Sequence, residues 1–378
     1  MASPLRTEAF HRDPFPTYRW LRDQHPVFHD TERATYVLTR FADVAEAARD
    51  HATFSSDDPA SRVLDRMTRM DPPRHDAWRD LTSASFRPRA VLRHEDLVRG
   101  IARDLLARAR ARGAGDLDVV RELAAPIPST TIGDLIGVPR EHNERFQALS
   151  EISIAGSPED ADAANREIWS VFDDLIDQRR RAPADDLLSR LLAATFEGGP
   201  LTRDQLLGYC LHLVVAGNDT TANLIGTGAL LLAEHPRIRA ELCERPELIP
   251  QAVEEMIRFD GPVQMLPRRC ARDVELHGVA IPAGAPVELY WGAANRDERQ
   301  FDDPDRFDIH RGEARHLGFG HGVHFCLGAH LARLEARVAF EELLAVAPRY
   351  RVVPGQALAI KPGWAIRGLT RLLVSLAG

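Results

Sequence analysis

The sequence predicts a mostly α-helical fold with small β-sheets, and three observations support this prediction. Residues 72–260 place apolar side chains at the three- and four-residue spacing of amphipathic helices. Residues 262–292 change to short alternating segments separated by Gly and Pro, as strands do. The chain has 378 residues, 44% of them hydrophobic, so it is long enough to bury a sizeable core.

The N-terminal part predicts one short helix and two strands. The helix is expected over residues 16–22, and the strands over 27–29 and 36–39, in a strand-rich part of about 25–40. The helical part follows from about residue 72 to 260. Its apolar residues at helix spacing include Leu97, Ile101, Leu105, Leu106, Ile168, Val171, Phe172, Leu175, Ile176, Leu187, Leu188, Leu191 and Leu192.

The longest predicted helix runs from about Thr202 to Glu234, and Pro236 ends it. Thr202 and Gln205 have the spacing of a capping box. Residues 216–221, Ala-Gly-Asn-Asp-Thr-Thr, interrupt the apolar pattern in the middle of this helix. Because Gly destabilises a helix and Asp and Thr offer the backbone other hydrogen bonds, we expect a kinked or opened helix there.

The last third of the chain predicts strands, then a loop, then a helix. Strands are expected in 262–292 and again in 350–377, with a loop-rich stretch over 295–322 between the two parts. A helix is expected from Cys326 to about residue 345. No repeat or Gly/Ser-rich linker divides the sequence, so we expect a single domain over residues 1–378.

Composition excludes several classes of protein. Lys and Arg total 48 against 56 Asp and Glu, a net charge of −8, which argues against a general nucleic-acid binder. The N-terminus has no apolar signal segment, and no apolar run approaches the ~20 residues of a membrane span. The four cysteines include no CxxC pair. We therefore expect a soluble cytoplasmic protein with reduced thiols.

The segment with the clearest chemistry is a glycine-rich loop that leads to Cys326 at the start of a predicted helix. Glycines let a backbone pass close to a large flat ligand, and a helix N-terminus favours a thiolate. A thiolate placed in this way can ligate haem iron. Two other interpretations are a zinc site with the neighbouring histidines and a buried structural cysteine. The spacings match no common zinc pattern, and the residues around Cys326 disfavour the structural cysteine.

The loop resembles the haem-ligand signature of the cytochrome P450 family. The pattern F-x-x-G-x-H-x-C-x-G is read here at Phe319, Gly322, His324, Cys326 and Gly328. Glu255 and Arg258 are similar to the family's E-x-x-R motif, and 295–307 resembles the segment before its haem loop. The resemblance implies a P450-like helical fold around a buried haem b. It also implies that Cys326 binds the iron and that Glu255, Arg258 and Arg306 form a buried charge network.

The resemblance also implies residues around the haem and the oxygen site. His75, Arg79, Arg268 and His324 would bind the haem propionates, with Arg269 as a possible alternative to Arg268. Phe319, Gly320 and Gly328 would line the cofactor. Residues 216–221 match the family's oxygen-activation motif. There, Ala216 and Gly217 would leave room for O2, Thr220 would hold it, and Asp219 would relay protons. This acid–alcohol pair favours O2 and two electrons over peroxide.

The substrate pocket is expected to combine apolar surface with a few polar groups. The expected lining residues are His212, Val215, Asn218, Val263, Gln264, Leu266 and Ile366. His212 and Gln264 would offer hydrogen bonds to a substrate, or they could be core residues bonded to backbone. The match to the family weakens over 54–70 and 140–182, which would wall this pocket.

These expectations predict a haem-thiolate monooxygenase that hydroxylates or epoxidises a small organic molecule, a natural-product biosynthetic intermediate. Electrons would come from a separate ferredoxin and reductase, or from a flavodoxin. Arg74, Arg333 and Arg337 could form a basic surface near Cys326 for such an acidic partner. Two alternatives remain open: an oxidative coupling or another non-hydroxylating oxidation at the same haem, and a non-catalytic haem sensor or carrier.

Overall fold

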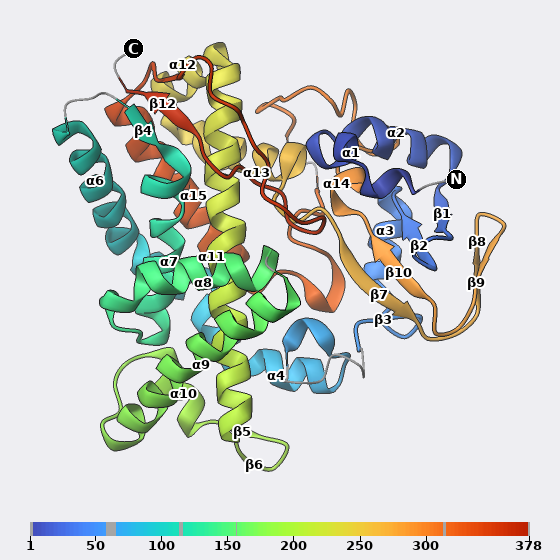
Figure 1. Cartoon of the computed structure of the whole chain (residues 1–378), viewed down its shortest axis with the longest axis horizontal. Helices are drawn as coiled ribbons and strands as arrows, with labels where there is room; N and C mark the ends of the chain where they lie inside the picture. The colour runs from blue at the N-terminus through green and yellow to red at the C-terminus, as the bar shows by residue number, and fades with distance from the viewer. Residues whose placement is uncertain (1–2, 58–65, 113–115, 156, 313–314, 377–378) are drawn as a thin grey trace.

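The computed structural model describes residues 3–57, 66–112, 116–155, 157–312 and 315–376, and it confirms the mostly helical fold with small sheets (Figure 1). Parts of the two variable stretches, 58–65 and residue 156, lie outside the described residues, as does residue 377 of the expected C-terminal strands. The α-helices are α1 (Glu8–Arg12), α2 (Phe15–Gln24), α3 (Phe41–Arg49), α4 (Arg74–Ser83), α5 (Pro88–Val91), α6 (Glu95–Ala111), α7 (Pro126–Ile136), α8 (Asn143–Ala155), α9 (Pro158–Arg181), α10 (Leu187–Ala193), α11 (Arg203–Glu234), α12 (Pro236–Glu244), α13 (Ile249–Asp260), α14 (Trp291–Ala294) and α15 (Ala329–Val346).

The strands form small sheets that lie beside and between these helices. They are β1 (Val27–Asp30), β2 (Thr35–Leu38), β3 (Phe54–Ser55), β4 (Asp116–Asp118), β5 (Thr195–Phe196), β6 (Gly199–Pro200), β7 (Leu266–Cys270), β8 (Val274–Leu276), β9 (Val279–Ile281), β10 (Pro286–Leu289), β11 (Arg351–Val352) and β12 (Leu373–Ser375). A five-stranded sheet has the order β1-β2-β10-β7-β3, and a three-stranded sheet has the order β11-β12-β4. In the larger sheet β10 pairs parallel to β2 and antiparallel to β7.

The long helix α11 runs as a column through the helical half of the molecule, and the five-stranded sheet lies in the other half (Figure 1). Thr202 caps α11, and both hydrogen bonds of the predicted capping box with Gln205 are present. Apolar residues of α11 belong to the main core together with those of α7, α9, α13 and α15. Residues 212–220 therefore lie in the middle of a helix that packs against several other helices.

The expectation of an opened helix at residues 216–221 is wrong. α11 is a continuous α-helix from Arg203 to Glu234. Its polar side chains bond to neighbouring elements or back along the helix. Thr220, for example, donates to the Ala216 carbonyl four residues earlier, a bond that can bend a helix without opening it. No helix in the described part of the chain is long and apolar enough to cross a membrane.

Candidate haem and oxygen site

The loop that carries Cys326 follows a fixed path against α3 and the core. The Cys326 N–H donates to the Phe319 carbonyl over 2.8 Å. Gly320 and Gly322 have φ angles of +73° and +70°, which glycine adopts without strain. A Cβ on Gly322 would lie 2.7 Å from the carbonyl oxygen of Ala48. The loop therefore needs its glycines both for its turns and for its close approach to α3.

The Cys326 thiol lies just before α15, which begins at Ala329 with Gly328 as its N-cap, slightly later than expected. Burial raises the pKa of this thiol and outweighs the opposing effects of the Gly328 N–H and of the Arg79 and Arg333 charges. The N–H at the helix start therefore favours a thiolate, as expected, but its effect is smaller than that of burial. A bound iron cation would supply the missing positive charge.

Four basic side chains gather beside this loop: His75 and Arg79 of α4, Arg268 of β7, and His324. The His75 and His324 rings are 4.3 Å apart between centroids. Burial lowers the pKa of His324 to about 3, and the nearby charges of Arg268, His75 and Arg79 act in the same direction. Burial likewise lowers the pKa of Arg268 to about 10. Arg268 is the buried one of the two neighbouring arginines, whereas Arg269 is exposed and donates to the Gly284 carbonyl.

These side chains fit the propionates of the haem that the resemblance implies. The Nε2 atoms of His75 and His324 are buried and have no hydrogen-bond partner among the residues described. Buried polar atoms are nearly always paired, so such atoms call for a missing partner. Two carboxylates placed here would accept from both rings and neutralise the arginine charges. Cys326 would then hold the iron on the side of the glycine-rich loop.

A second group of predicted residues forms one accessible stripe on α11. His212, Ala216 and Thr220 follow one another at four-residue spacing and so share a face. All three keep solvent access, although most residues around them in α11 are buried. Gly217 points elsewhere, because a Cβ there would lie 3.2 Å from Ile132 of α7. Its lack of a side chain thus has a packing reason, and Ala216 is the small residue on the stripe.

The two polar residues between Gly217 and Thr220 bond to other elements. Asp219 is buried; its Oδ1 accepts from Lys361 Nζ over 2.5 Å and its Oδ2 from Asn223 Nδ2 over 3.0 Å. The Asn218 amide donates to Ser150 of α8 over 3.2 Å. Asn218 therefore joins α11 to α8, and its amide N–H is not presented to a substrate, contrary to its expected place in the pocket.

His212 and Gln264, the two expected polar pocket residues, have different surroundings. Gln264 is buried; its amide accepts from the Tyr18 hydroxyl over 2.9 Å and donates to the Gly261 carbonyl over 2.7 Å. The expectation that Gln264 recognises substrate is therefore wrong, because its partners are protein groups. The His212 ring makes no hydrogen bond to any residue that the structure describes. Burial lowers its pKa to about 4, helped by the Arg66 charge, so the imidazole is neutral near pH 7.

The expected apolar residues of the pocket come from two parts of the chain. Val215 is a partly buried residue of α11 that packs on the main core. Val263 and Ile366 face each other across an antiparallel bridge, and Leu266 begins β7 beside them. The structure thus brings the C-terminal segment next to the strand that carries Arg268.

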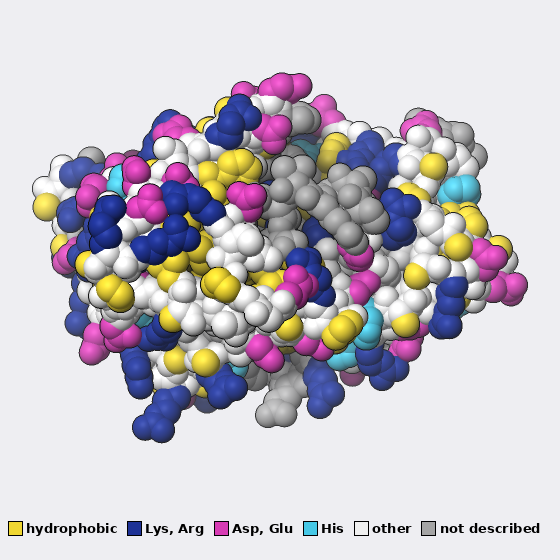
Figure 2. Space-filling view, turned by 90° about the horizontal axis from the view of Figure 1, so that it is seen from below, with side chains coloured by type: hydrophobic (Ala, Val, Ile, Leu, Met, Phe, Trp, Pro, Cys, Tyr) yellow, Lys and Arg dark blue, Asp and Glu magenta, His cyan; other side chains and the backbone are white. Residues whose placement is uncertain are grey.

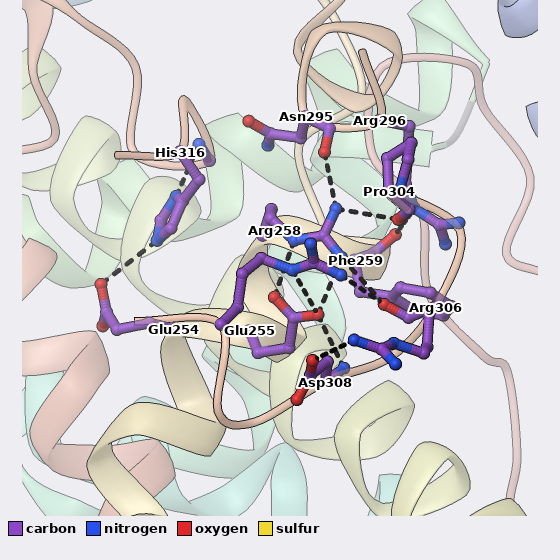
Figure 3. Close-up of polar contacts among 12 residues, drawn as sticks. Glu254, Glu255, Arg258, Phe259, Asn295, Arg296, Pro304, Arg306, Asp308 and His316 are labelled. Atoms are coloured by element: carbon purple, nitrogen blue, oxygen red, sulfur yellow. Dashed lines mark hydrogen bonds and ion pairs between the residues drawn. The ribbon is translucent and has the colours of Figure 1, made fainter. Parts of the chain in front are cut away.

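Glu255 and Arg258 form a buried charge pair, but the third expected member is different (Figure 3). Arg258 donates to Glu255 over 2.7 and 2.8 Å, and also to the carbonyls of Asn295 and Pro304. Arg306 contributes only its backbone carbonyl to Arg258, whereas its exposed guanidinium pairs with Asp308.

The prediction for the Arg306 side chain is therefore wrong. The guanidinium that reaches Glu255 belongs to Arg311, at 3.4 Å, and it is largely buried. Sequence reasoning missed Arg311 because no motif marks it. Its spacing after Arg306 is the only signal in the sequence, and that spacing is not specific.

The expected basic surface near Cys326 is neutralised. Arg333 pairs with Glu254, Arg337 with Glu95 and Glu341, and Arg74 with Glu197. On the face shown in Figure 2, basic and acidic side chains are likewise interspersed. Within the described chain these three arginines therefore form ion pairs and not an open cationic cluster.

Comparisons with known proteins agree with this geometry. The cytochrome P450 family profile matches residues 159–352. Vitamin D(3) 25-hydroxylase of Pseudonocardia autotrophica is 40% identical over 388 positions, which cover 98% of this chain and 96% of that protein.

Two solved structures are also similar. Cytochrome P450 PksS of the Bacillus subtilis bacillaene polyketide synthase has a TM-score of 0.92 at 33% identity and covers both chains fully, at 100% each. CYP109E1 from Bacillus megaterium in complex with testosterone also has a TM-score of 0.92 at 33% identity, covering 99% of this chain and 100% of that one. The chain therefore belongs to the cytochrome P450 family of haem-iron monooxygenases.

Proposed function

We propose that this enzyme binds haem b through Cys326 and hydroxylates or epoxidises a small organic molecule, an intermediate of natural-product biosynthesis. One oxygen atom of O2 enters the substrate and the other leaves as water, with the consumption of two electrons and two protons. The observation that carries the proposal is the pairing of two arrangements. The Cys326 loop and its basic cluster fit a haem, and an accessible stripe of α11 carries Thr220.

The residues of the chain have separate tasks in this proposal. His75, Arg79, Arg268 and His324 hold the propionates by charge-assisted hydrogen bonds. Cys326 would hold the haem iron, and a haem bound in this way would supply the chemistry that cleaves the O–O bond.

On α11, Thr220 presents a hydroxyl whose own proton is directed to the Ala216 carbonyl, so the oxygen remains free to accept a hydrogen bond. Asp219 is the neighbouring acid and is the group we assign to proton delivery.

Similar proteins and the pocket both support the substrate class. The named relatives are a vitamin D(3) hydroxylase, a P450 of a polyketide synthase and a P450 with bound testosterone. Vitamin D(3) and testosterone are mostly apolar molecules with few polar groups. His212 offers a neutral imidazole without a hydrogen-bond partner in the described chain, beside apolar Val215. One polar contact in an apolar pocket suits a substrate of this kind.

Electrons are proposed to come from a separate ferredoxin and reductase, or from a flavodoxin. Residues 1–378 are proposed to form one domain, since PksS matches the whole chain without a remainder. A cytoplasmic location is also proposed, because Cys210, Cys243 and Cys270 are free thiols.

The test combines an optical titration with isotope labelling. Ferric enzyme is titrated with an apolar panel (terpenes, fatty acids, steroids) and a polar panel (hydroxyl- and amide-bearing polyketides and small peptides). A Soret shift identifies molecules that displace the iron-bound water. Turnover of those molecules under ¹⁸O2 with surrogate redox partners should give products that carry a single labelled oxygen atom. Products of oxidative coupling that lack the label would contradict the proposal, and so would NADPH consumption without any product.

A further inference from the structure

Lys361 is the only lysine of the chain, and it lies in a C-terminal hairpin that approaches α11. The hairpin spans residues 359–370. Its strands meet at the bridge between Ile360 and Leu369, and the Lys361 N–H donates to the Gly368 carbonyl over 2.8 Å. These bonds hold the backbone on either side of the Lys361 side chain.

The ammonium group of Lys361 connects three separate elements. Its Nζ lies 2.5 Å from Asp219 Oδ1 of α11 and 3.2 Å from Glu151 Oε1 of α8. The Lys361 side chain is 12% exposed and that of Asp219 is 4% exposed, whereas that of Glu151 is 43% exposed. The lysine therefore joins a buried carboxylate of the oxygen site to a carboxylate at the surface.

The contact requires a close approach of the hairpin to α11. A Cβ on Gly368 would lie 2.3 Å from the Asn223 side chain, so only glycine fits at this position. Asn223 in turn donates to the second oxygen of Asp219. Lys361 and Asn223 thus each hold one oxygen of the Asp219 carboxylate, and Gly368 leaves room for the Asn223 side chain.

These contacts determine where the carboxylate is held. Asp219 and Thr220 are neighbours on α11, yet the Thr220 hydroxyl bonds Ala216 and the Asp219 oxygens bond Lys361 and Asn223. A buried carboxylate that loses its cation is left uncompensated, which is strongly unfavourable. The position of Lys361 therefore decides which orientations are open to Asp219.

We propose that Lys361 is a positioning residue that holds the Asp219 carboxylate and, through Glu151, couples it to the placement of α8. The inference rests on the proposed role of Asp219 in proton delivery. A shift of α8 would then weaken the hold on Lys361 and alter the freedom of Asp219. The substrate pocket wall and the oxygen site are linked in this way by one ammonium group.

The first experiment uses the single lysine as a chemical probe of the purified holoenzyme. Lys361 is labelled with an amine reagent, and mass spectrometry follows its rate relative to the N-terminal amine. The ion pairs shield it, so Asp219→Asn should raise the relative rate about tenfold, equivalent to about 1.4 kcal/mol. Glu151→Gln should raise the rate less, because Glu151 is partly exposed. An unchanged labelling rate in Asp219→Asn would show that the ion pair between Lys361 and Asp219 does not protect the lysine in solution, and would overturn the proposal.

The second experiment separates positioning from simple support of the fold. Lys361→Met should lower the product formed per NADPH about tenfold, the size typical when a group that orients a functional side chain is removed. The substrate dissociation constant measured from the Soret shift should stay unchanged. Lys361→Arg should recover most of the product formed per NADPH. An equal yield of product per NADPH in Lys361→Met and the wild type would overturn the proposal. A loss of this yield that Lys361→Arg does not rescue would also overturn it.

A control is available at the end of α12. Arg245, the C-cap residue of α12, also bridges two carboxylates, Glu241 at 3.2 Å and Glu247 at 3.4 Å, and in the part of the chain that the structure describes it makes no ion pair to Asp219. Arg245→Met should leave the product formed per NADPH unchanged. Failure of the proposed function would be distinct from failure of this inference. An enzyme without any thiolate-type spectrum would refute the function, whereas the labelling rates report the ion pair in either case.

Discussion

The basic cluster beside Cys326 and the middle of α11 differ in how their buried polar groups are paired. In the cluster, buried Nε2 atoms of His75 and His324 have no partner among the described residues, and Arg268 lies buried beside them. In α11, the Asp219 carboxylate accepts from Lys361 and Asn223, and the Asn218 amide donates to Ser150. An anionic cofactor would complete the first region, whereas the Asp219 carboxylate of the second is already paired with protein groups, and His212, Ala216 and Thr220 stay accessible beside it.

The largest effect is expected from the charge pair that supports the Cys326 side. Arg258→Leu should destabilise the protein by about 3–5 kcal/mol, because it strands the buried Glu255 carboxylate. Arg306→Ala should change stability by no more than about 0.5 kcal/mol, because its guanidinium is exposed. Denaturant unfolding of the haem-loaded enzyme measures both. Equal effects of the two changes would restore Arg306 to the network and contradict its placement here.

The α11 side is tested by removing its acid. Asp219→Asn keeps the shape of the side chain and removes the carboxylate assigned to proton delivery, so the product formed per NADPH should fall about 100-fold, within the range of general acid–base catalysis. Product and NADPH are measured together. Asn218→Ser, which alters the hydrogen bond to Ser150 of α8, should lower the product formed per NADPH far less. Comparable losses in the two variants would mean that packing, and not acid chemistry, sets the rate.

The cluster side is tested with neighbouring arginines. Arg268→Met removes a buried cation from the proposed propionate site, so haem should transfer to an acceptor protein at least about tenfold faster. Arg269→Met provides the control, because Arg269 is exposed and bonds Gly284. If Arg269→Met released haem as fast as Arg268→Met, the assignment of Arg268 would be refuted.

A smaller effect is expected for substrate recognition. His212→Leu removes the neutral imidazole from the accessible stripe, and affinity for a hydrogen-bonding substrate should fall about tenfold at most. Gln264→Leu should instead lower stability, because Tyr18 and Gly261 lose their partner. The Soret titration and an unfolding curve separate the two outcomes. An unchanged affinity in His212→Leu would make His212 a packing residue.

The smallest effect concerns pH. Burial lowers the pKa of His212 to about 4, below the ordinary value of about 6.5 in an unfolded chain. Between these values the unfolded chain binds a proton that the folded chain does not, so stability falls as pH drops through this window. His212→Leu should flatten the difference in unfolding midpoint between pH 7 and pH 4.5. An identical pH dependence in the variant would contradict the lowered pKa of His212.

Local motifs were predictable from the sequence, whereas partners distant in sequence were not. The capping box of Thr202, the strand pattern of β8 to β10 and the family of the Cys326 loop follow from residues close together in the chain. Gln264 was misassigned because its partner Tyr18 is 246 positions away, and no pattern links them. Arg311 and Lys361 were missed for the same reason. Lys361 meets Asp219 across 142 positions, through a hairpin that only the folded chain creates.

The measurement that tests the central claim most directly is the optical spectrum of the reduced enzyme under carbon monoxide, for the wild type and for Cys326→Ser. The account predicts a thiolate-type Soret band in the wild type that is lost in Cys326→Ser, while Cys243→Ser retains it. A wild-type band typical of a histidine-ligated haem, or one that survives in Cys326→Ser, would contradict the assignment of Cys326 and the function built on it.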